Sequence, residues 1–236
     1  MGRQWLQKNK EITANRRAKI VTKMVREITI AAKMGVPDPE MNPRLALAVE
    51  AARKHSVSND TIARAIKKAS GQGAEAVNYE LVTYEGMGPQ KVPIIVECMT
   101  ENRNRTAPDI RSLFKDVQFG TKVTFLFDYR GIVEATHEQA GMDLETAAIE
   151  AGAQDVQPLE HVPEDHSGGR FLADRTDLYT VADALKKAGW TVASAELGYV
   201  AKDPIALSEK DKAQVEAFLE RLDDHDDVHR VYAAFK

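Results

Sequence analysis

Cysteine, aromatic residues and long apolar runs are all scarce in this chain of 236 residues. Its single cysteine, Cys98, excludes an internal disulfide and fits a protein of the reducing cytoplasm. No apolar run approaches the roughly 20 residues of a membrane-spanning helix. The basic N-terminus has no apolar segment behind it that would make a secretory signal. We therefore expect a soluble cytoplasmic protein with no membrane partner, in which Cys98 is a buried, unreactive thiol.

Acidic residues are scarce in the first third of the chain. Residues 1–76 contain 15 Lys and Arg but only 7 Asp and Glu, a net charge of +8, whereas the remaining 17 basic and 29 acidic residues give −12. A basic segment on an acidic body is typical of proteins that bind an anion, most often a nucleic acid. The alternative is that the two parts neutralise each other within the protein. The arrangement of the charges favours the anion.

The first third has the periodicity of three short amphipathic helices. The first helix is predicted over residues 13–34, with a basic stripe opposite its apolar face. The prolines of "VPDPEMNP" end it, and Asn42 then caps a second helix that has Pro43 in its first turn. A third helix begins at Ser58. The sequence thus predicts a basic three-helix bundle over residues 1–76, which a short linker joins to the rest.

The rest of the chain alternates between strand and helix periods, which predicts an α+β fold. Strands are expected in "YELVTYEG", "KVPIIVECM" and "KVTFLFDY", with a helix at about 106–117 before the last of them. Residues 131–203 hold two β-α-β units in tandem, the ferredoxin-like βαββαβ arrangement, whose helices both open with Asp-Leu-x-Thr and close at a capping glycine. A final helix, begun by a capping box at Ser208, and the strand "VHRVYAAF" complete the layer that precedes the repeat. We therefore predict two interleaved α+β domains, one of residues 77–130 with 204–236 and one formed by the insert.

The basic stripe of the first helix is the strongest candidate site. It comprises Lys19, Lys23, Arg26 and Lys33, with Arg16 leading into it. Lys and Arg placed along phosphates give affinity without sequence specificity, and that affinity falls steeply with salt. A charged stripe is usually only a solvated helix face, but acidic residues are nearly absent from this one. Trp5, in the basic arm, has two readings: it stacks on an unpaired base, or it packs on the bundle.

The stretch "TENRNRTAPDIR" holds a second candidate, where a strand is expected to end and a helix to begin. "TAPD" fits a capping box, which gives Thr106 and Asp109 a structural role. It leaves Arg103 and Arg105 unexplained, because a helix N-terminus already carries partial positive charge and is itself an anion site. Two readings stay open: the arginines face a phosphate, or they are neutralised by acids of the protein, either Glu101 and Asp109 or those of the insert.

Features typical of an enzyme are weak. His225 and His229 have a metal-like spacing if they lie on a helix, but the Asp residues around them are more typical of a turn between a helix and a strand. "HSGGR" lacks the lysine and the helix of a phosphate loop. No nucleophile, base and orienting group occur together. We predict no catalytic residue, no metal site, no cofactor and no small-molecule substrate.

Several motifs together resemble one known family. They are "KIVTKMVREITIAAKMG", "DPEMNPRLALAVEAAR", "YEGMGP", "VECMTENRNRTAPDIR" and "LDDHDDVHRVYAAF". In this order, and over nearly the whole chain, they are similar to the YebC/PmpR family, a relative of which is the mitochondrial translational activator of cytochrome oxidase subunit one. The resemblance implies a helical domain and two interleaved α+β domains. The chain departs from the family at its N-terminus, where Gly2, Trp5 and Lys8 match but the usual His-Ser-Lys step is replaced, and in a shortened "KDVQFGTKVTFLF".

The resemblance implies a function as well as a fold. Members of the family are described as DNA-binding transcriptional regulators and as ribosome-associated translation factors, with no enzymatic activity. We therefore predict a non-enzymatic DNA-binding regulator. The alternatives are a translation factor that binds ribosomal RNA and an acidic protein-interaction module. The predicted nucleic-acid contacts are Lys8, Arg16, Lys19, Lys23, Arg26, Lys33, Arg103 and Arg105. Neither the recognised sequence nor the oligomeric state follows from these residues.

Overall fold

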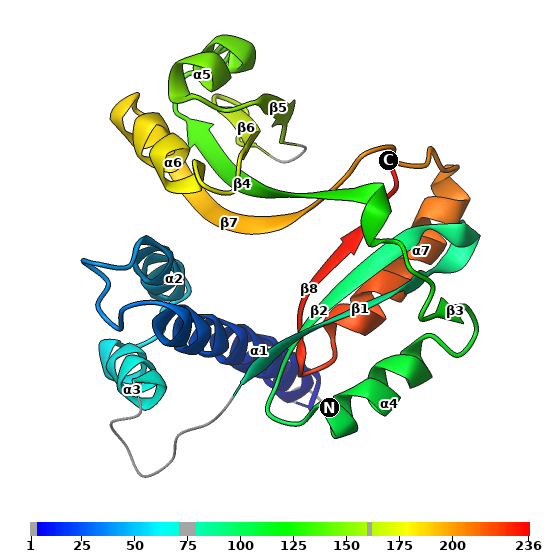
Figure 1. Ribbon diagram of the computed structural model, residues 1–236. Coiled ribbons are helices and arrows are strands. Elements are labelled where there is room, and N and C mark those ends of the chain that lie inside the picture. The colour runs from blue at the N-terminus through cyan, green and yellow to red at the C-terminus, as the bar shows by residue number, and fades with distance from the viewer. Residues whose placement is uncertain (1–3, 71–78, 160–161) are drawn as a thin grey trace. The chain divides into compact units, whose positions relative to one another are not determined.

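The protein folds into two compact units that interleave along the sequence (Figure 1). The structure is a computed structural model that describes residues 4–70, 79–159 and 162–236, with residues 4–17 and Met34 described by their backbone alone. One unit takes the chain up to Tyr84 together with Val96–Asp116 and Glu216–Val231, and the other takes the segments between and after them. The linker predicted after the bundle lies outside the described residues.

Three helices of the first unit share one apolar core. They are α1 (Gln4–Met34), α2 (Pro43–Lys54) and α3 (Asn59–Ala69). Ile28, Leu45 and Ile62 meet in that core. The caps follow the prediction: the side chain of Asn42 accepts the N–H of Leu45 at 3.1 Å, with Pro43 in the first turn of α2. Only the start of α1 differs from the prediction, since the helix begins at Gln4 and so includes most of the basic arm.

The first sheet has the strand order β3-β1-β2-β8. Its strands are β1 (Glu80–Met87), β2 (Pro93–Thr100), β3 (Gln118–Phe119) and β8 (Val228–Ala233), and a short 3₁₀ turn, η1 (Pro89–Lys91), joins the first two. All eight residues of β2 are buried, which explains its unbroken apolar run, because an interior strand is covered on both faces. Cys98 lies within it and is buried, as predicted, and burial raises the pKa of its thiol to about 12.

Two further helices accompany this sheet. They are α4 (Arg103–Leu113) and α7 (Glu209–Asp223), and Phe114 at the end of α4 meets Phe218 of α7 edge to face, with ring centres 5.2 Å apart. The predicted capping box at Ser208 is present: the Ser208 hydroxyl donates to Asp211 at 2.6 Å and accepts the Asp211 N–H at 3.3 Å.

The second sheet confirms the ferredoxin-like arrangement. Its elements are β4 (Phe127–His137), α5 (Leu144–Ala151), β5 (Asp155–Pro158), β6 (Ser167–Ala173), α6 (Leu178–Lys187) and β7 (Thr191–Ala201), with the antiparallel order β5-β6-β4-β7. Phe171, Leu185 and Trp190 lie in the core between this sheet and the two helices. Gly152 ends α5 with φ +77°, a left-handed conformation in which glycine has no steric cost. The fold class is therefore α+β; the domain boundaries at residues 76, 130 and 203 stay predictions.

Two predicted elements need correction. The helix predicted at 106–117 is α4, which begins at Arg103 because Asn102, not Thr106, caps it. The strand predicted in "KVTFLFDY" starts only at Phe127 and continues through Gly131 as one long strand. The first half of the predicted strand is instead a 3₁₀ turn, η2 (Thr124–Leu126). The backbone N–H groups of Val123 and Thr124 bond to the Glu85 carboxylate rather than to a neighbouring strand.

Candidate nucleic-acid interface

An acidic turn of residues 223–227 faces the basic stripe of α1 inside the first unit. The turn forms where α7 ends and β8 begins, and the N–H of Asp224 still reaches the carbonyl of Glu220 at 2.9 Å. Leu222 and Val228, on either side of it, are fully buried. The turn is therefore held by the core at both ends, and its carboxylates have defined positions.

Three cations of the stripe, Lys19, Lys23 and Arg26, contact this turn. Lys19 Nζ lies 3.1 Å from the Asp224 carboxylate, and Lys23 pairs with Asp223. Both ammonium groups also donate to the backbone carbonyls of their partners, at 2.9 and 3.1 Å. The spacing of four residues places the two lysines on one face of α1, so consecutive acids of one turn meet consecutive cations of one helix.

A groove runs between α1 and α7, the helix that the acidic turn follows. It has a volume of about 690 Å³ and is lined on one side by Lys19, Ile20 and Lys23 of α1. The opposite wall consists of Glu216, Leu219, Glu220, Asp223 and Asp224, with Val231 of β8. Cations and acids thus line opposite walls, and an anion that enters the groove competes with carboxylates for the lysines.

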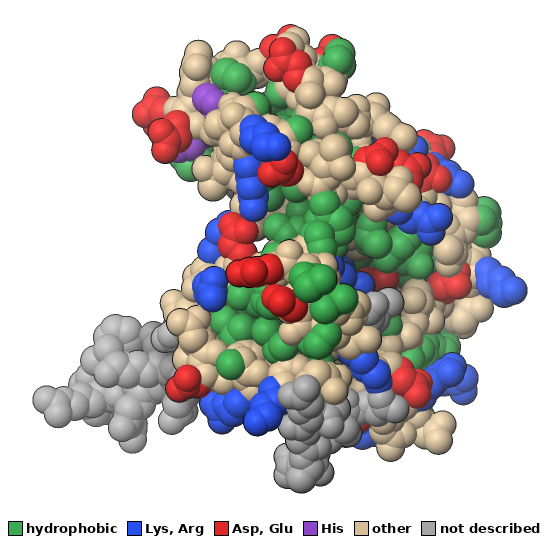
Figure 2. Space-filling model, turned by 60° about the vertical axis from the view of Figure 1, so that its left-hand side comes forward, with side chains coloured by type: hydrophobic (Ala, Val, Ile, Leu, Met, Phe, Trp, Pro, Cys, Tyr) green, Lys and Arg blue, Asp and Glu red, His purple; other side chains and the backbone are tan. Residues whose placement is uncertain are grey.

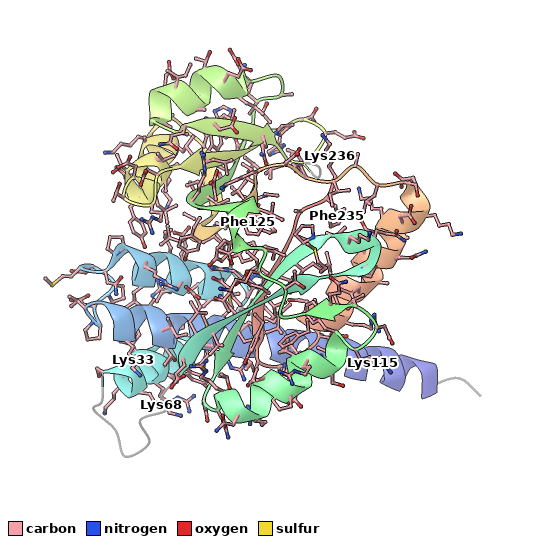
Figure 3. The ribbon with its side chains drawn as sticks, turned by 45° about the vertical axis from the view of Figure 1, so that its right-hand side comes forward. Lys33, Lys68, Lys115, Phe125, Phe235 and Lys236 are labelled. Carbon is pink, nitrogen blue, oxygen red and sulfur yellow. The ribbon has the colours of Figure 1, made fainter. Side chains whose placement is uncertain are left out.

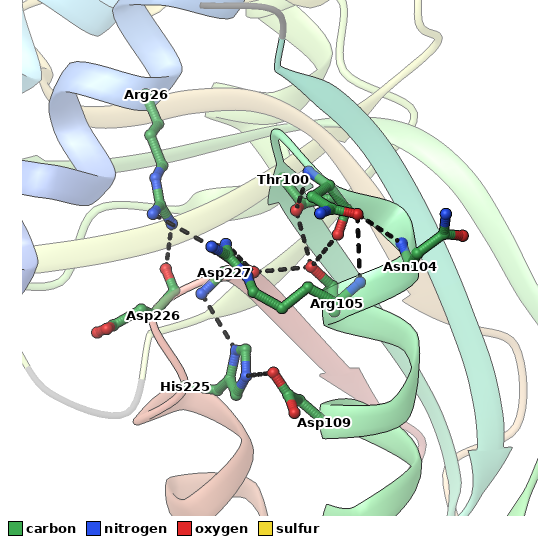
Figure 4. Close-up of polar contacts among 10 residues, drawn as sticks. Arg26, Thr100, Asn104, Arg105, Asp109, His225, Asp226 and Asp227 are labelled. Atoms are coloured by element: carbon green, nitrogen blue, oxygen red, sulfur yellow. Dashed lines mark hydrogen bonds and ion pairs between the residues drawn. The ribbon is translucent and has the colours of Figure 1, made fainter.

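Asp227 connects α1, α4 and β8 (Figure 4). Its carboxylate is only 4% exposed, lies 3.5 Å from Arg26 and 3.1 Å from Arg105, and accepts the Thr106 hydroxyl at 2.7 Å. Burial raises the pKa of this carboxyl, but the hydrogen bonds from Thr106 and Arg105 and the charges of Arg105 and Arg26 outweigh burial. The pKa therefore lies below its usual range, and the carboxylate is charged at neutral pH. Arg26 also donates to the backbone carbonyl of Asp226.

The contacts at the start of α4 favour one of the two readings for Arg105, in which it faces an acid of the protein rather than a phosphate. The side chain of Asn102 caps the helix by accepting the N–H groups of Asn104 at 3.0 Å and Arg105 at 3.3 Å. The capping box predicted at Thr106 is wrong, because the Thr106 hydroxyl is buried and committed to Asp227 and Thr100. Arg105 faces an internal acid, Asp227, which is neither Glu101 nor Asp109 and lies outside the insert.

The eight predicted contact residues now have different surroundings. Lys19, Lys23, Arg26 and Arg105 lie against acids of residues 223–227. Arg103 is exposed at the first position of α4, and the ion pairs of the described residues do not include it. Lys33 is exposed at the end of α1, and Figure 3 labels it beside Lys68 at the end of α3. The side chains of Lys8 and Arg16 lie outside the described part of the chain.

The two histidines of the acidic run pair with separate acids. His225 Nε2 lies 3.7 Å from Asp109 of α4, and His229 Nε2 lies 2.9 Å from Glu27 of α1. Burial raises the pKa of Glu27, but His229 and nearby arginines outweigh it, so that pKa lies well below its usual range. Because the two histidines point to different acids, they do not converge on one ion. Within the described ranges, no group of three or more potential ligands is placed to hold a metal.

The surface has basic and mixed regions. In Figure 2, side chains of both signs are mixed over most of the face, and one group of Lys and Arg side chains lies near its lower edge. Arg64 and Lys67 of α3 are exposed and add to the basic surface of the helices. No helix among the residues that the structure describes is long and apolar enough to cross a membrane.

Comparison with known proteins places these features in one family. Residues 79–235 match the TACO1/YebC second and third domain, and residues 2–72 match the TACO1/YebC protein N-terminal domain. A probable transcriptional regulatory protein of Pseudomonas syringae is 48% identical over 98% of both chains, and one of Bdellovibrio bacteriovorus is 44% identical over 99% of both. The crystal structure of a conserved hypothetical protein from Aquifex aeolicus aligns with a TM-score of 0.82 and 34% identity, over 93% of this chain and 90% of that one.

Proposed function

The chain belongs to the TACO1/YebC family, and we propose that it is a non-enzymatic cytoplasmic regulator that binds the phosphates of DNA through its basic N-terminal helices. Relatives over the full length are named probable transcriptional regulatory proteins, which supports a role in transcription. The observation that supports the phosphate contacts is that three cations of α1, Lys19, Lys23 and Arg26, each pair with a carboxylate oxygen.

The acidic turn shows what the stripe is able to bind. A carboxylate and a phosphate offer similar charged oxygen acceptors, and lysine binds both as a point charge. Asp223 and Asp224 are 61% and 79% exposed, so their ion pairs are in contact with water. Exposed ion pairs contribute only about 0.2–1 kcal/mol each. A DNA strand with several phosphates is therefore able to replace them.

The contacts differ in how readily they exchange. Lys19 and Lys23, which are 41% and 18% exposed, are held by exposed acids that a phosphate is able to replace, whereas Arg26 is held by the buried Asp227 and keeps a structural role. Arg103 and the exposed cations of α3 extend the proposed surface. We assign no cofactor, small-molecule substrate or membrane to this function.

The test measures binding of a labelled duplex DNA by fluorescence anisotropy over a salt series. If Lys19, Lys23, Arg103 and one exposed cation of α3 contact phosphates, log K falls with log [salt] with a slope of about −3.6. The double variant Lys19→Glu/Lys23→Glu should weaken binding to all sequences alike, because the contacts are to phosphate. Arg26 is left unchanged, since a new acid there would face Asp227.

The matched control is Lys187→Glu, which reverses an exposed lysine of α6 that is also paired with an acid, at 2.7 Å from Asp183. It should leave binding unchanged. Binding that does not depend on salt, or an equal effect of both variants, contradicts the proposal. A parallel series with ribosomal RNA, and co-sedimentation with ribosomes against promoter occupancy in cells, decides between DNA and the ribosome as the target.

A further inference from the structure

Phe125 is an aromatic side chain that the core leaves outside. It is 68% exposed, whereas Val123 and Phe127, two residues to either side, are buried in one apolar cluster (Figure 3). A single exposed apolar residue is common and needs no explanation by itself. The turn that carries this ring is the unusual part.

The turn is fixed by hydrogen bonds on both sides. The Glu85 carboxylate accepts the N–H groups of Val123 at 2.7 Å and Thr124 at 2.8 Å. Lys202 encloses the other side: its ammonium group donates to the Phe125 carbonyl at 3.0 Å and its backbone N–H to the Leu126 carbonyl, also at 3.0 Å.

The carboxylate that holds the turn is charged at neutral pH. Burial raises the pKa of Glu85, but hydrogen bonds from Thr124 and Val123 and the charge of Lys122 lower it by more than burial raises it. The pKa therefore lies below its usual range. The aromatic ring therefore sits on a preformed turn, and a ligand that binds it pays little entropy to order the protein.

Two lysines lie next to the turn that carries the ring, one in sequence and one through a hydrogen bond. Lys202 contacts the turn directly, and Lys122 is exposed three residues before Phe125. Lys202 also lies 3.4 Å from Asp128, a carboxylate that it shares with Arg130 at 3.3 Å. Proteins hold single-stranded nucleic acid by stacking its bases on exposed aromatic rings while nearby cations meet the phosphates, and the turn brings an exposed ring and exposed lysines into one short stretch of surface.

We propose that Phe125 stacks on an unpaired base of single-stranded RNA, with Lys122 and Lys202 at the adjoining phosphates. Duplex DNA is unsuited to this contact, because its bases are already stacked inside the helix. RNA is the nucleic acid whose unpaired loops and ends proteins commonly bind on aromatic side chains. The inference rests on the proposed nucleic-acid function and adds to it a second contact, in the other unit from α1.

The test compares the full chain with three variants at Phe125, using a labelled 12-nucleotide single-stranded RNA of mixed sequence. Phe125→Ala should bind about 5- to 140-fold more weakly, which is the usual effect of removing one stacked base contact. Phe125→Leu should be as weak as Phe125→Ala, because leucine is apolar but offers no flat face. Phe125→Trp should keep the affinity, and the fluorescence of the new tryptophan should be quenched when RNA is added.

The control is Ile149→Ala, which removes a 78% exposed apolar side chain from α5 in the same unit and should not change binding. Thermal unfolding of Phe125→Ala should match the wild type, since the ring is exposed.

If the wild type binds neither RNA nor DNA at low salt, the proposed function itself fails, and this inference with it. If the wild type binds with a salt dependence but Phe125→Ala binds equally well, only the stacking contact is refuted. Wild-type affinity in Phe125→Leu, or an effect of Phe125→Ala seen with single-stranded or duplex DNA but not with RNA, refutes it too.

Discussion

The exposed half of the acidic turn should reduce the affinity of the basic stripe for nucleic acid. Asp223 and Asp224 occupy Lys23 and Lys19, so a phosphate gains each lysine only after a carboxylate leaves. The double variant Asp223→Asn/Asp224→Asn keeps the size and polarity of both side chains and removes their charge. We expect this variant to bind duplex DNA more tightly than the wild type.

The structure sets the size of the gain. Each exposed pair contributes about 0.2–1 kcal/mol, so the two together correspond to a twofold to about thirtyfold gain in affinity. The lower half of that range is the better expectation, because both ammonium groups also donate to backbone carbonyls of the turn, and asparagine leaves these contacts intact. The gain should shrink as salt rises, since salt already screens exposed pairs.

The assay is anisotropy of a labelled 20-base-pair duplex at salt concentrations from about 50 to 200 mM. The control, Asp183→Asn, neutralises one exposed acid that pairs with Lys187 on α6. It separates the effect of the turn from the general effect of a less negative protein. Unchanged or weaker binding by the double variant, or an equal gain in the control, would refute the view that the turn competes with phosphates.

Three further predictions concern Asp227 and the arginines near it. Asp227→Ala should lower the free energy of unfolding by about 3 kcal/mol, because it removes the carboxylate that pairs with Arg26, which is only 14% exposed, and that accepts the buried Thr106 hydroxyl. Asp226→Ala, at an exposed neighbour, should have little effect; urea unfolding measures both. The folded-state pKa of Asp227 is lowered, so its contribution to stability is present above its unfolded pKa and is lost as the pH falls through the folded one. As the pH falls below about 4, the ordinary pKa of an Asp side chain, the wild type should therefore lose more stability than Asp227→Asn, and equal losses would contradict this sign. Finally, Arg103→Ala should weaken DNA binding more than Arg105→Ala, and Arg105→Ala should lower stability more, because Arg105, unlike Arg103, pairs with Asp227.

Local patterns in the sequence determine most of the fold. Helical periodicity and caps such as Asn42 and Ser208 act within a few residues, and the structure has them where they were predicted. The ferredoxin-like repeat was predictable for a similar reason: the side chain of Asp143 caps the start of α5, and a glycine with positive φ follows both helices, Gly152 after α5 and Gly189 after α6. The second Asp-Leu-x-Thr motif did not act as a cap, because the side chain of Asp177 makes no hydrogen bond to the start of α6. The linear order of the strands and helices then leaves few ways to bury their apolar faces.

The candidate site was harder to predict, because its contacts join distant residues. Asp227 lies 122 residues from Arg105, and no local pattern links the two. The capping box at Thr106 failed for this reason: the motif is present, but a distant carboxylate takes the hydroxyl and Asn102 caps instead. One signal was available, since a run of four acids in five residues near the C-terminus is a natural partner for a cationic stripe. It was interpreted only as a turn.

The burial of the acidic turn changes along its length, and this separates two roles of one segment. Asp227 is buried, paired with two arginines and bonded to Thr106, so its loss strands charge inside the protein and DNA has no means to replace it. Asp223 and Asp224 are exposed, and their partners lie nearer the N-terminal end of α1. A nucleic acid that replaces the outer acids thus leaves Asp227 in place. The proposed interface is able to open at Lys19 and Lys23 while the unit beneath it remains folded around Arg26.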